Sequence, residues 1–265
     1  MNVNDIARIV KERDIEFLFA QYVNIYGVAN AKLVPASHLE DMVNDGACFA
    51  GFAAVGFGVG PDYPDLMAIP DLDTLTILPW RRNIARFACN VYEEDGKGGR
   101  RPSPTCSRSI LQRVVAKARE KGYIFKIGIE PEFSLVKKTP EGIEPADEWD
   151  TLTKPCYDLK GLTRPIDFLE TMIRAMNDMG WDVYATDHED ANSQYEINFQ
   201  YGDCVNMCDR YIFFRYMAAT LAQQEGLVAT FMPKPFANRT GNGAHFHMSL
   251  WDARTGENVF LDRND

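Results

Sequence analysis

The chain has 265 residues, of which 46% are hydrophobic and 25% charged, and its formal net charge is −10. This length and composition predict a soluble globular protein with one large or two modest domains and a sizeable core. The acidic balance argues against nucleic acid or an anionic membrane as a partner, but a bound divalent metal would still permit nucleotide binding.

Three further features predict a cytoplasmic protein with no membrane association. Residues 1–8 carry charges where a signal peptide would be apolar. The longest apolar stretch, residues 48–60, is interrupted by four glycines and is too short to span a bilayer. The six cysteines show no CxxC spacing and are expected to be free thiols: Cys48, Cys89, Cys106, Cys156, Cys204 and Cys208.

Residues 1–100 predict a small domain rich in strands. A helix over residues 3–13 precedes a strand over 15–23. Ser37 and Glu40 have the spacing of a capping box, which predicts a short helix ending near Asn44. Three more strands are expected, followed by a glycine-rich turn at 95–99: residues 66–69, 74–78 and 84–92.

Residues 101–265 predict a second domain of the α+β class. Helical periodicity and glycine stops indicate three helices, at residues 109–121, 166–179 and 203–225. Residues 138–164 are polar and turn-rich, which predicts an excursion at the surface. The strands are expected at residues 123–127, 181–185, 194–201, 228–232 and 244–250.

Two glutamates lie two residues apart just after the first of these strands. If the extended run continues through them, Glu130 and Glu132 project from the same face of the sheet. Two adjacent carboxylates repel each other and raise each other's pKa. A divalent cation, an Arg or Lys partner, or simple exposure to solvent would each relieve that repulsion, and the spacing alone does not choose among them.

Later strands carry similar side chains. Glu189 follows one predicted strand, Glu196 lies within the next, and His245 and His247 share a face of the last. Each residue taken singly is as well explained by a surface charge or a hydrogen-bonded histidine. Together, carboxylates with one or two imidazoles suit Mg²⁺ or Mn²⁺ and favour a metal site.

A glycine-containing segment before the last strand indicates an anion site. Lys234 and Arg239 supply positive charge, and Gly241 and Gly243 allow close approach of the backbone to a ligand. The spacing differs from that of the Walker-type phosphate loop.

Taken in order, these motifs resemble those of the glutamine synthetase family. The matching stretches are Gly128–Phe133, His188–Glu196 and Met232–Ser249, and the last of these is the most specific. The resemblance implies a small N-terminal β-grasp domain, residues 1–100, and a catalytic domain with a curved antiparallel sheet flanked by helices, residues 101–265. It also implies a homo-oligomeric ring, a dodecamer, with active sites between subunits.

The resemblance also assigns roles to individual residues. Glu132, Glu189 and Glu196 resemble the ligands of one metal, and Glu130 and His245 resemble ligands of a second. The positions that resemble nucleotide contacts are Tyr201, His247, Ser249 and Lys234. The positions that resemble substrate contacts are Thr240, Gly241 and Asp65, although many relatives carry Asn where Thr240 stands.

The implied activity is an ATP-dependent ligation that joins an amine to the γ-carboxylate of L-glutamate through γ-glutamyl phosphate. Two divalent metals, Mg²⁺ or Mn²⁺, would neutralise the polyanionic substrates. Residues 51–57 lack the acidic residue with which glutamine synthetases bind ammonium. Methylamine or a similar small amine is therefore the favoured substrate, because losing that carboxylate removes a charge-assisted hydrogen bond to ammonium.

Three alternatives remain open. One is a glutamine synthetase that uses ammonia, and another is a non-catalytic, nucleotide-binding relative. A generic metallohydrolase is weaker, because it gives no reason for the loop at residues 234–245. Family members continue beyond the position of residue 265 with an arginine cluster and a last glutamate ligand. The resemblance therefore implies that residues 101–265 are the N-terminal portion of a catalytic domain, and leaves open whether this chain is active alone.

Overall fold

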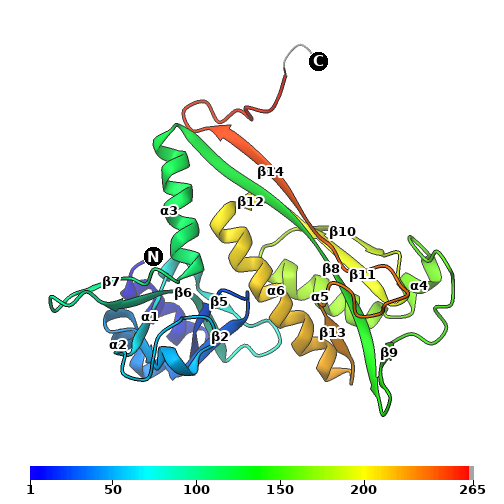
Figure 1. Ribbon diagram of the computed structural model, residues 1–265, viewed down its shortest axis with the longest axis horizontal. Coiled ribbons are helices and arrows are strands. Elements are labelled where there is room, and N and C mark those ends of the chain that lie inside the picture. Colours follow the sequence, from blue (N-terminus) through cyan, green and yellow to red (C-terminus); the bar gives the residue numbers. More distant parts are fainter. Residues whose placement is uncertain (263–265) are drawn as a thin grey trace. The chain divides into compact units, whose positions relative to one another are not determined.

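The computed structural model describes residues 1–262 and divides the chain into two compact units, Met1–Glu120 and Lys121–Asp265 (Figure 1). The first unit includes the helix at residues 107–120, whereas the sequence predicts a domain boundary at residue 100. That boundary between functional domains stays a prediction. Across residues 1–262, no helix is long and apolar enough to cross a membrane.

The first unit is a mixed sheet with helices. Its strand order is β2-β1-β6-β4-β3, and β5 and β7 also pair with β6. β1 and β6 run parallel, whereas the other pairs are antiparallel. The β-grasp assignment stays a prediction. The elements are α1 (Val3–Glu12), β1 (Phe17–Val23), β2 (Ala29–Pro35), α2 (Leu39–Asn44), β3 (Ala47–Phe49), β4 (Leu66–Pro70), β5 (Thr76–Ile77), β6 (Ile84–Glu94), β7 (Arg100–Pro102) and α3 (Ser107–Glu120).

One expected cap in this unit is wrong. Ser37 does not cap a helix, because residues 36–38 form a 3₁₀ turn after Pro35 and α2 begins only at Leu39. His38 is the residue before α2, and its side chain makes no capping hydrogen bond. Pro35 has a fixed φ and lacks an N–H, which suits the start of this tight turn and moves the helix start beyond the serine.

The second unit is an antiparallel sheet organised around one long strand. β8 pairs antiparallel with five other strands, β9, β11, β12, β13 and β14, and β10 pairs antiparallel with β11. This agrees with the expected α+β class and antiparallel sheet flanked by helices. The elements are β8 (Tyr123–Thr139), β9 (Gly142–Pro145), α4 (Leu159–Thr163), α5 (Ile166–Asp178), β10 (Val183–His188), β11 (Gln194–Phe199), β12 (Gly202–Asp203), α6 (Cys204–Gln224), β13 (Val228–Thr230) and β14 (Ala244–Asp252).

The two faces of β8 have different neighbours. Phe133 is fully buried and contacts Phe168 on α5 and Phe214 on α6, so these helices cover the face from which the odd-numbered residues project. Side chains alternate along a strand. Glu130 and Glu132 therefore project from the opposite face, as the sequence predicted, and the helices cannot cover them.

Two segments are more ordered or differently bounded than expected. The excursion at residues 138–164 contains β9 and α4. The strand expected from Trp181 begins at Val183, because Trp181 is buried against Phe199 and Asp182 takes a positive φ of 55°. That shift places Asp187 and His188 at the end of β10, and Glu189 directly after it.

Candidate metal and substrate site

The register of β8 with its neighbours brings the predicted ligands together. Glu132 lies opposite Glu196 of β11, and Glu130 lies opposite His245 of β14. Because the partners in an antiparallel pair stand about 5 Å apart on the same face, strand pairing alone aligns these four side chains. Glu189 enters from the turn after β10, which is paired with β11.

These residues form two clusters that share one carboxylate. Ligand atoms of Glu132, Glu189 and Glu196 all lie within 4.8 Å of one another, and so do those of Glu130, Glu196 and His245. All five predicted metal ligands are thus brought together. The shared member, Glu196, is only 7% exposed.

Charge in the clusters is not compensated by a protein cation. Over residues 1–262, the recorded ion pairs of these glutamates involve only His245 and His247, and none involves Lys or Arg. Burial raises the pKa of Glu196 to about 7, despite a hydrogen bond from Asn198. Burial also raises the pKa of Glu189, and the charges of Glu132 and Asp187 add to this effect. Carboxylates that are costly to ionise without a counter-charge, set beside the imidazole of His245, fit a Mg²⁺ or Mn²⁺ site.

The carboxylate of Glu132 is held in place on one side. Its Oε2 accepts hydrogen bonds from Nε2 of Gln194 at 2.8 Å and from the backbone N–H of Gly243 at 2.9 Å. A Cβ at Gly243 would lie 2.6 Å from Oε1 of Glu132. A side chain at position 243 would therefore displace the Glu132 carboxylate from the position that these two hydrogen bonds give it.

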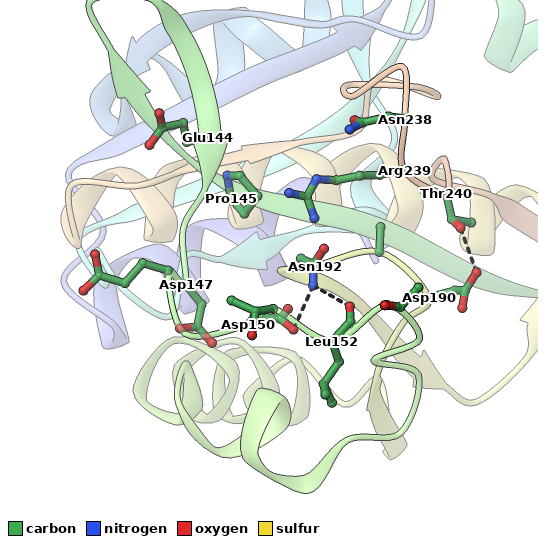
Figure 2. A pocket seen from close by; sticks show the side chains of 14 residues that line it. Glu144, Pro145, Asp147, Asp150, Leu152, Asp190, Asn192, Asn238, Arg239 and Thr240 are labelled. Atoms are coloured by element: carbon green, nitrogen blue, oxygen red, sulfur yellow. Dashed lines mark hydrogen bonds between the residues drawn. The ribbon is translucent and has the colours of Figure 1, made fainter.

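The loop before β14, residues 233–243, is held by contacts with Gln194 and with Asp190, which Figure 2 shows beside Thr240. Gln194 also donates to the carbonyl oxygen of Gly241 at 2.9 Å, and a Cβ at Gly241 would lie 2.2 Å from the Pro233 carbonyl oxygen. Thr240 donates its hydroxyl to Asp190 at 2.7 Å. Nζ of Lys234 donates to the carbonyl oxygen of Arg239 at 2.7 Å, so this lysine stabilises the loop.

A buried pair supports the turn that carries Glu189. His188 and Asp150 have fully buried side chains, and Nε2 of His188 lies 2.9 Å from Oδ2 of Asp150. Nδ1 of His188 lies 2.8 Å from the carbonyl oxygen of Glu189. Asp150 also accepts from the backbone N–H of Ser193 at 2.6 Å. The pair thereby ties residue 150 to the turn between β10 and β11.

Three of the four predicted nucleotide contacts line one cavity of about 560 Å³ together with Glu130: Tyr201, His247 and Ser249. Trp251 lines it too, and its ring stacks near Tyr201 at a centroid distance of 6.3 Å. Nε2 of His247 lies 3.0 Å from Oε1 of Glu130, which connects the cavity to the second cluster. Lys234, the fourth predicted contact, does not line this cavity.

Asp65 belongs to the first unit and is exposed just before β4. In the same unit, residues 51–53 form a 3₁₀ turn, and the nearby apolar side chains of Phe52 and Val55 are 55% and 67% exposed. Residues 51–57, which lack an acidic side chain, thus expose hydrophobic side chains at the surface of this unit.

Sequence reasoning missed several residues of the site. Gln194 is fully buried and links Glu132 to the loop at Gly241, and Trp251 extends the aromatic wall of the cavity. A glutamine at the start of a strand and a tryptophan at the end of one carry no local signal of these roles. Their partners lie 62, 47 and 50 residues away, so only the tertiary structure reveals them.

A family model described as glutamine synthetase, catalytic domain, matches residues 104–265. Among curated proteins, a glutamate–methylamine ligase of Methyloversatilis universalis is 44% identical over 100% of this chain and 59% of its own length. A glutamine synthetase of Rhizobium leguminosarum bv. phaseoli is 40% identical over 98% of this chain and 58% of its own length.

The fold is also similar to that of solved proteins. A structure described as a GmaS/ADP complex superimposes with a TM-score of 0.92 at 43% identity, over 97% of this chain and 58% of that one. The chain thus spans under two thirds of the length of the relatives and of the solved protein that it matches.

Proposed function

This chain belongs to the glutamine synthetase family, and we propose that the protein containing it is an ATP-dependent ligase that joins a small amine to the γ-carboxylate of L-glutamate through γ-glutamyl phosphate. The observation that carries the proposal is the pair of ligand clusters that share Glu196. Two adjacent divalent cations suit a reaction between a nucleoside triphosphate and a carboxylate, because both reactants are anions whose repulsion the cations reduce.

Each of the two clusters would hold one metal ion. Glu132, Glu189 and Glu196 would hold one cation, and Glu130, His245 and Glu196 would hold the other. When bound, such cations neutralise phosphate and carboxylate charge and align the reacting oxygens. The chain itself supplies the fixed geometry, since Gln194 and Gly243 orient Glu132 before any ligand enters.

The cavity beside Glu130 is suited to the nucleotide. Its aromatic wall, Tyr201 and Trp251, offers stacking surfaces for a planar base, and His247 and Ser249 offer polar contacts. The cavity reaches Glu130, so a nucleotide lying along it would direct its phosphates toward the second cluster. Thr240 and Gly241, on the other side of Glu132, are proposed to contact glutamate.

Methylamine or a similar alkylamine is proposed as the preferred nucleophile. The support is the missing acid in residues 51–57, the exposed apolar side chains of Phe52 and Val55, and the likeness to a glutamate–methylamine ligase. An apolar surface stabilises a methyl group but offers no charge-assisted hydrogen bond to ammonium. Asp65 is the acidic residue of this region that is proposed to contact the amine.

The test uses the full-length protein that contains this chain. ADP formation is measured with ATP, L-glutamate and either methylamine or ammonium, with Mg²⁺ or Mn²⁺ and with EDTA. We expect ADP only when glutamate, amine and metal are all present, and a higher kcat/KM for methylamine. ADP release that does not depend on glutamate would contradict the ligase proposal, and nucleotide binding without turnover would identify a non-catalytic relative.

Glutamine synthesis from ammonia is the second candidate. The observation that favours it is the 40% identity to a glutamine synthetase over nearly the whole chain. A higher kcat/KM for ammonium in the same assay would select it, while leaving the metal and nucleotide assignments in place.

Two further proposals concern the assembly and the compartment. We propose a homo-oligomeric ring, a dodecamer by resemblance to the family, which light scattering on the full-length protein would test. A cytoplasmic location is proposed because all six cysteines are free in the structure, as suits a reducing compartment. Fluorescent tagging in the source cell would test the location.

A further inference from the structure

A lysine contacts both rings of the aromatic wall in the cavity beside Glu130. Nζ of Lys126 lies 4.2 Å from the ring centroid of Trp251 and 5.8 Å from that of Tyr201. Both distances fall within the range of about 6 Å over which an ammonium group is attracted to an aromatic face. Lys126 is not among the residues that line the cavity, so its ammonium group reaches the rings rather than the space that they border.

The strand register brings this lysine to the two rings. Lys126 of β8 lies opposite Asp203 of β12 and opposite Ser249 of β14, which are therefore on the two edges of β8. Tyr201 directly precedes β12, and Trp251 lies two residues beyond Ser249, so its side chain projects from the same face of β14 as that serine. The strand that carries the lysine therefore lies between the two segments that carry the rings.

The ammonium group has no competing partner. Over residues 1–262, no carboxylate forms a recorded ion pair with Lys126, and its two cation–π contacts are its recorded side-chain interactions. Tyr201 is 45% exposed and has no recorded side-chain hydrogen bond in the same residues, whereas Nε1 of Trp251 donates to Oγ of Ser249 at 2.9 Å. The lysine is thus a contact that Tyr201 and Trp251 share, besides the contact of their own rings, which are inclined by 19°.

A glycine keeps the space open between this lysine and the second cluster. Lys126, Gly128 and Glu130 alternate with two buried residues on β8 and project from one face. A Cβ at Gly128 would already lie 3.4 Å from Cβ of Tyr201. Four residues of strand span about 13 Å, so the lysine and the glutamate lie at opposite ends of this face. A nucleotide lying along β8 would therefore have its base at the end of Lys126 and its phosphates at the end of Glu130.

We propose that Lys126 is a positioning residue for the base of the nucleotide: its ammonium group holds the rings of Tyr201 and Trp251 in place before the nucleotide enters. The inference rests on the proposed function, because it takes this cavity to be the nucleotide site. A ring that is already fixed loses less conformational freedom when a base stacks on it, so binding is tighter. Lys126 acts through the rings and does not reach the phosphates, which would lie beside Glu130.

Binding of adenosine and of ADP to the full-length protein tests this role, measured by isothermal titration in Mg²⁺ without glutamate or amine. Adenosine carries the base and the ribose but no phosphate, so it reports on the stacking surface alone. K126M keeps most of the length of the side chain and removes its charge. We expect it to weaken the binding of both ligands by the same factor, about tenfold, because both lose the same preorganised rings. K126Q takes its place if K126M does not melt cooperatively.

Further variants separate the role of the charge from a loss of structure. K126R should bind adenosine within about threefold of wild type, because a guanidinium group also stacks on aromatic faces. K138M is the matched control, since Lys138 is an exposed lysine of the same strand, and it should leave binding unchanged. In the ligase assay, K126M should raise KM for ATP about tenfold and keep kcat within about twofold of wild type.

Three results would overturn the role of Lys126. The first is weaker binding of ADP by K126M with unchanged binding of adenosine, which would place the ammonium group on a phosphate. The second is unchanged binding of both ligands. The third is a fall in kcat as large as the rise in KM together with a lower melting temperature, which would indicate a purely structural lysine.

The same titration distinguishes a failure of this inference from a failure of the proposed function. A wild-type protein that binds neither adenosine nor ADP would contradict both, because the cavity would then not be a nucleotide site. Binding of both ligands by the wild type, with equal binding by K126M, would contradict the role of Lys126 alone.

Discussion

Replacing Glu196 by Gln should stabilise the metal-free protein and reduce the stability that it gains from metal. The substitution keeps the size of the side chain but removes one charge from both clusters. Burial raises the pKa of Glu196 from 4.5 to about 7, so ionising it at pH 8 costs up to about 3 kcal/mol in the folded state. A raised carboxyl pKa means that stability present below pH 4.5 is lost as the pH rises through 7. Gln does not titrate, so the variant avoids that loss.

Metal should remove most of this advantage of the variant. At a free metal concentration 100 times Kd, binding adds about 2.7 kcal/mol to the wild-type protein. Mutating a group that hydrogen-bonds to a metal ligand weakens metal binding by about 10- to 100-fold. Losing the ligand itself should therefore weaken binding by about 100-fold or more. The same metal concentration would then equal Kd and add only about 0.4 kcal/mol to the variant.

The assay is thermal melting of both proteins at pH 8 in EDTA and in Mg²⁺, and at pH 5 in EDTA. We expect E196Q to melt higher than wild type in EDTA at pH 8, with most of that difference lost in Mg²⁺, and close to wild type at pH 5. E141Q, in an exposed turn, is the matched control. A variant that melts lower in EDTA at pH 8, or that gains as much from Mg²⁺ as wild type, would refute the reasoning.

Three further substitutions test other parts of the site. G243A should lower Mn²⁺ affinity about tenfold, measured by electron paramagnetic resonance, because the new Cβ would lie 2.6 Å from Oε1 of Glu132; G202A, where the nearest atom is 3.6 Å away, should not. D150A should cost about 3–5 kcal/mol in denaturant unfolding, since His188 and a backbone N–H lose a buried acceptor; a loss below 1 kcal/mol would contradict this. Y201A should raise KM for ATP about tenfold with little change in kcat, and an unchanged KM would argue against base stacking there.

Part of the arrangement of the proposed metal ligands was accessible to sequence reasoning because strand periodicity is local. The alternation of Glu130 and Glu132 with buried Phe133 follows from a period of two, and the motifs gave the order of the remaining ligands. Periodicity does not supply register, however. That Glu196 lies opposite Glu132 and His245 opposite Glu130 depends on pairing across 64 and 115 positions, which only the structure gives.

Features that rest on single tertiary contacts were not predictable. The capping box at Ser37 had the right spacing, but Pro35 started a 3₁₀ turn first. Gly243 was expected to let the backbone approach a ligand, whereas its neighbour in the structure is Glu132. Asp150 gave no signal within a polar excursion, yet it is fully buried and supports the turn that carries Glu189.

Anomalous diffraction from crystals of the full-length protein soaked in Mn²⁺ tests the shared-ligand site most directly. We predict two peaks on either side of the Glu196 carboxylate, one near Glu132 and Glu189 and the other near Glu130 and His245. A single peak away from Glu196, or no peak at a Mn²⁺ concentration that supports ADP formation, would contradict the assignment of these two clusters as the metal sites.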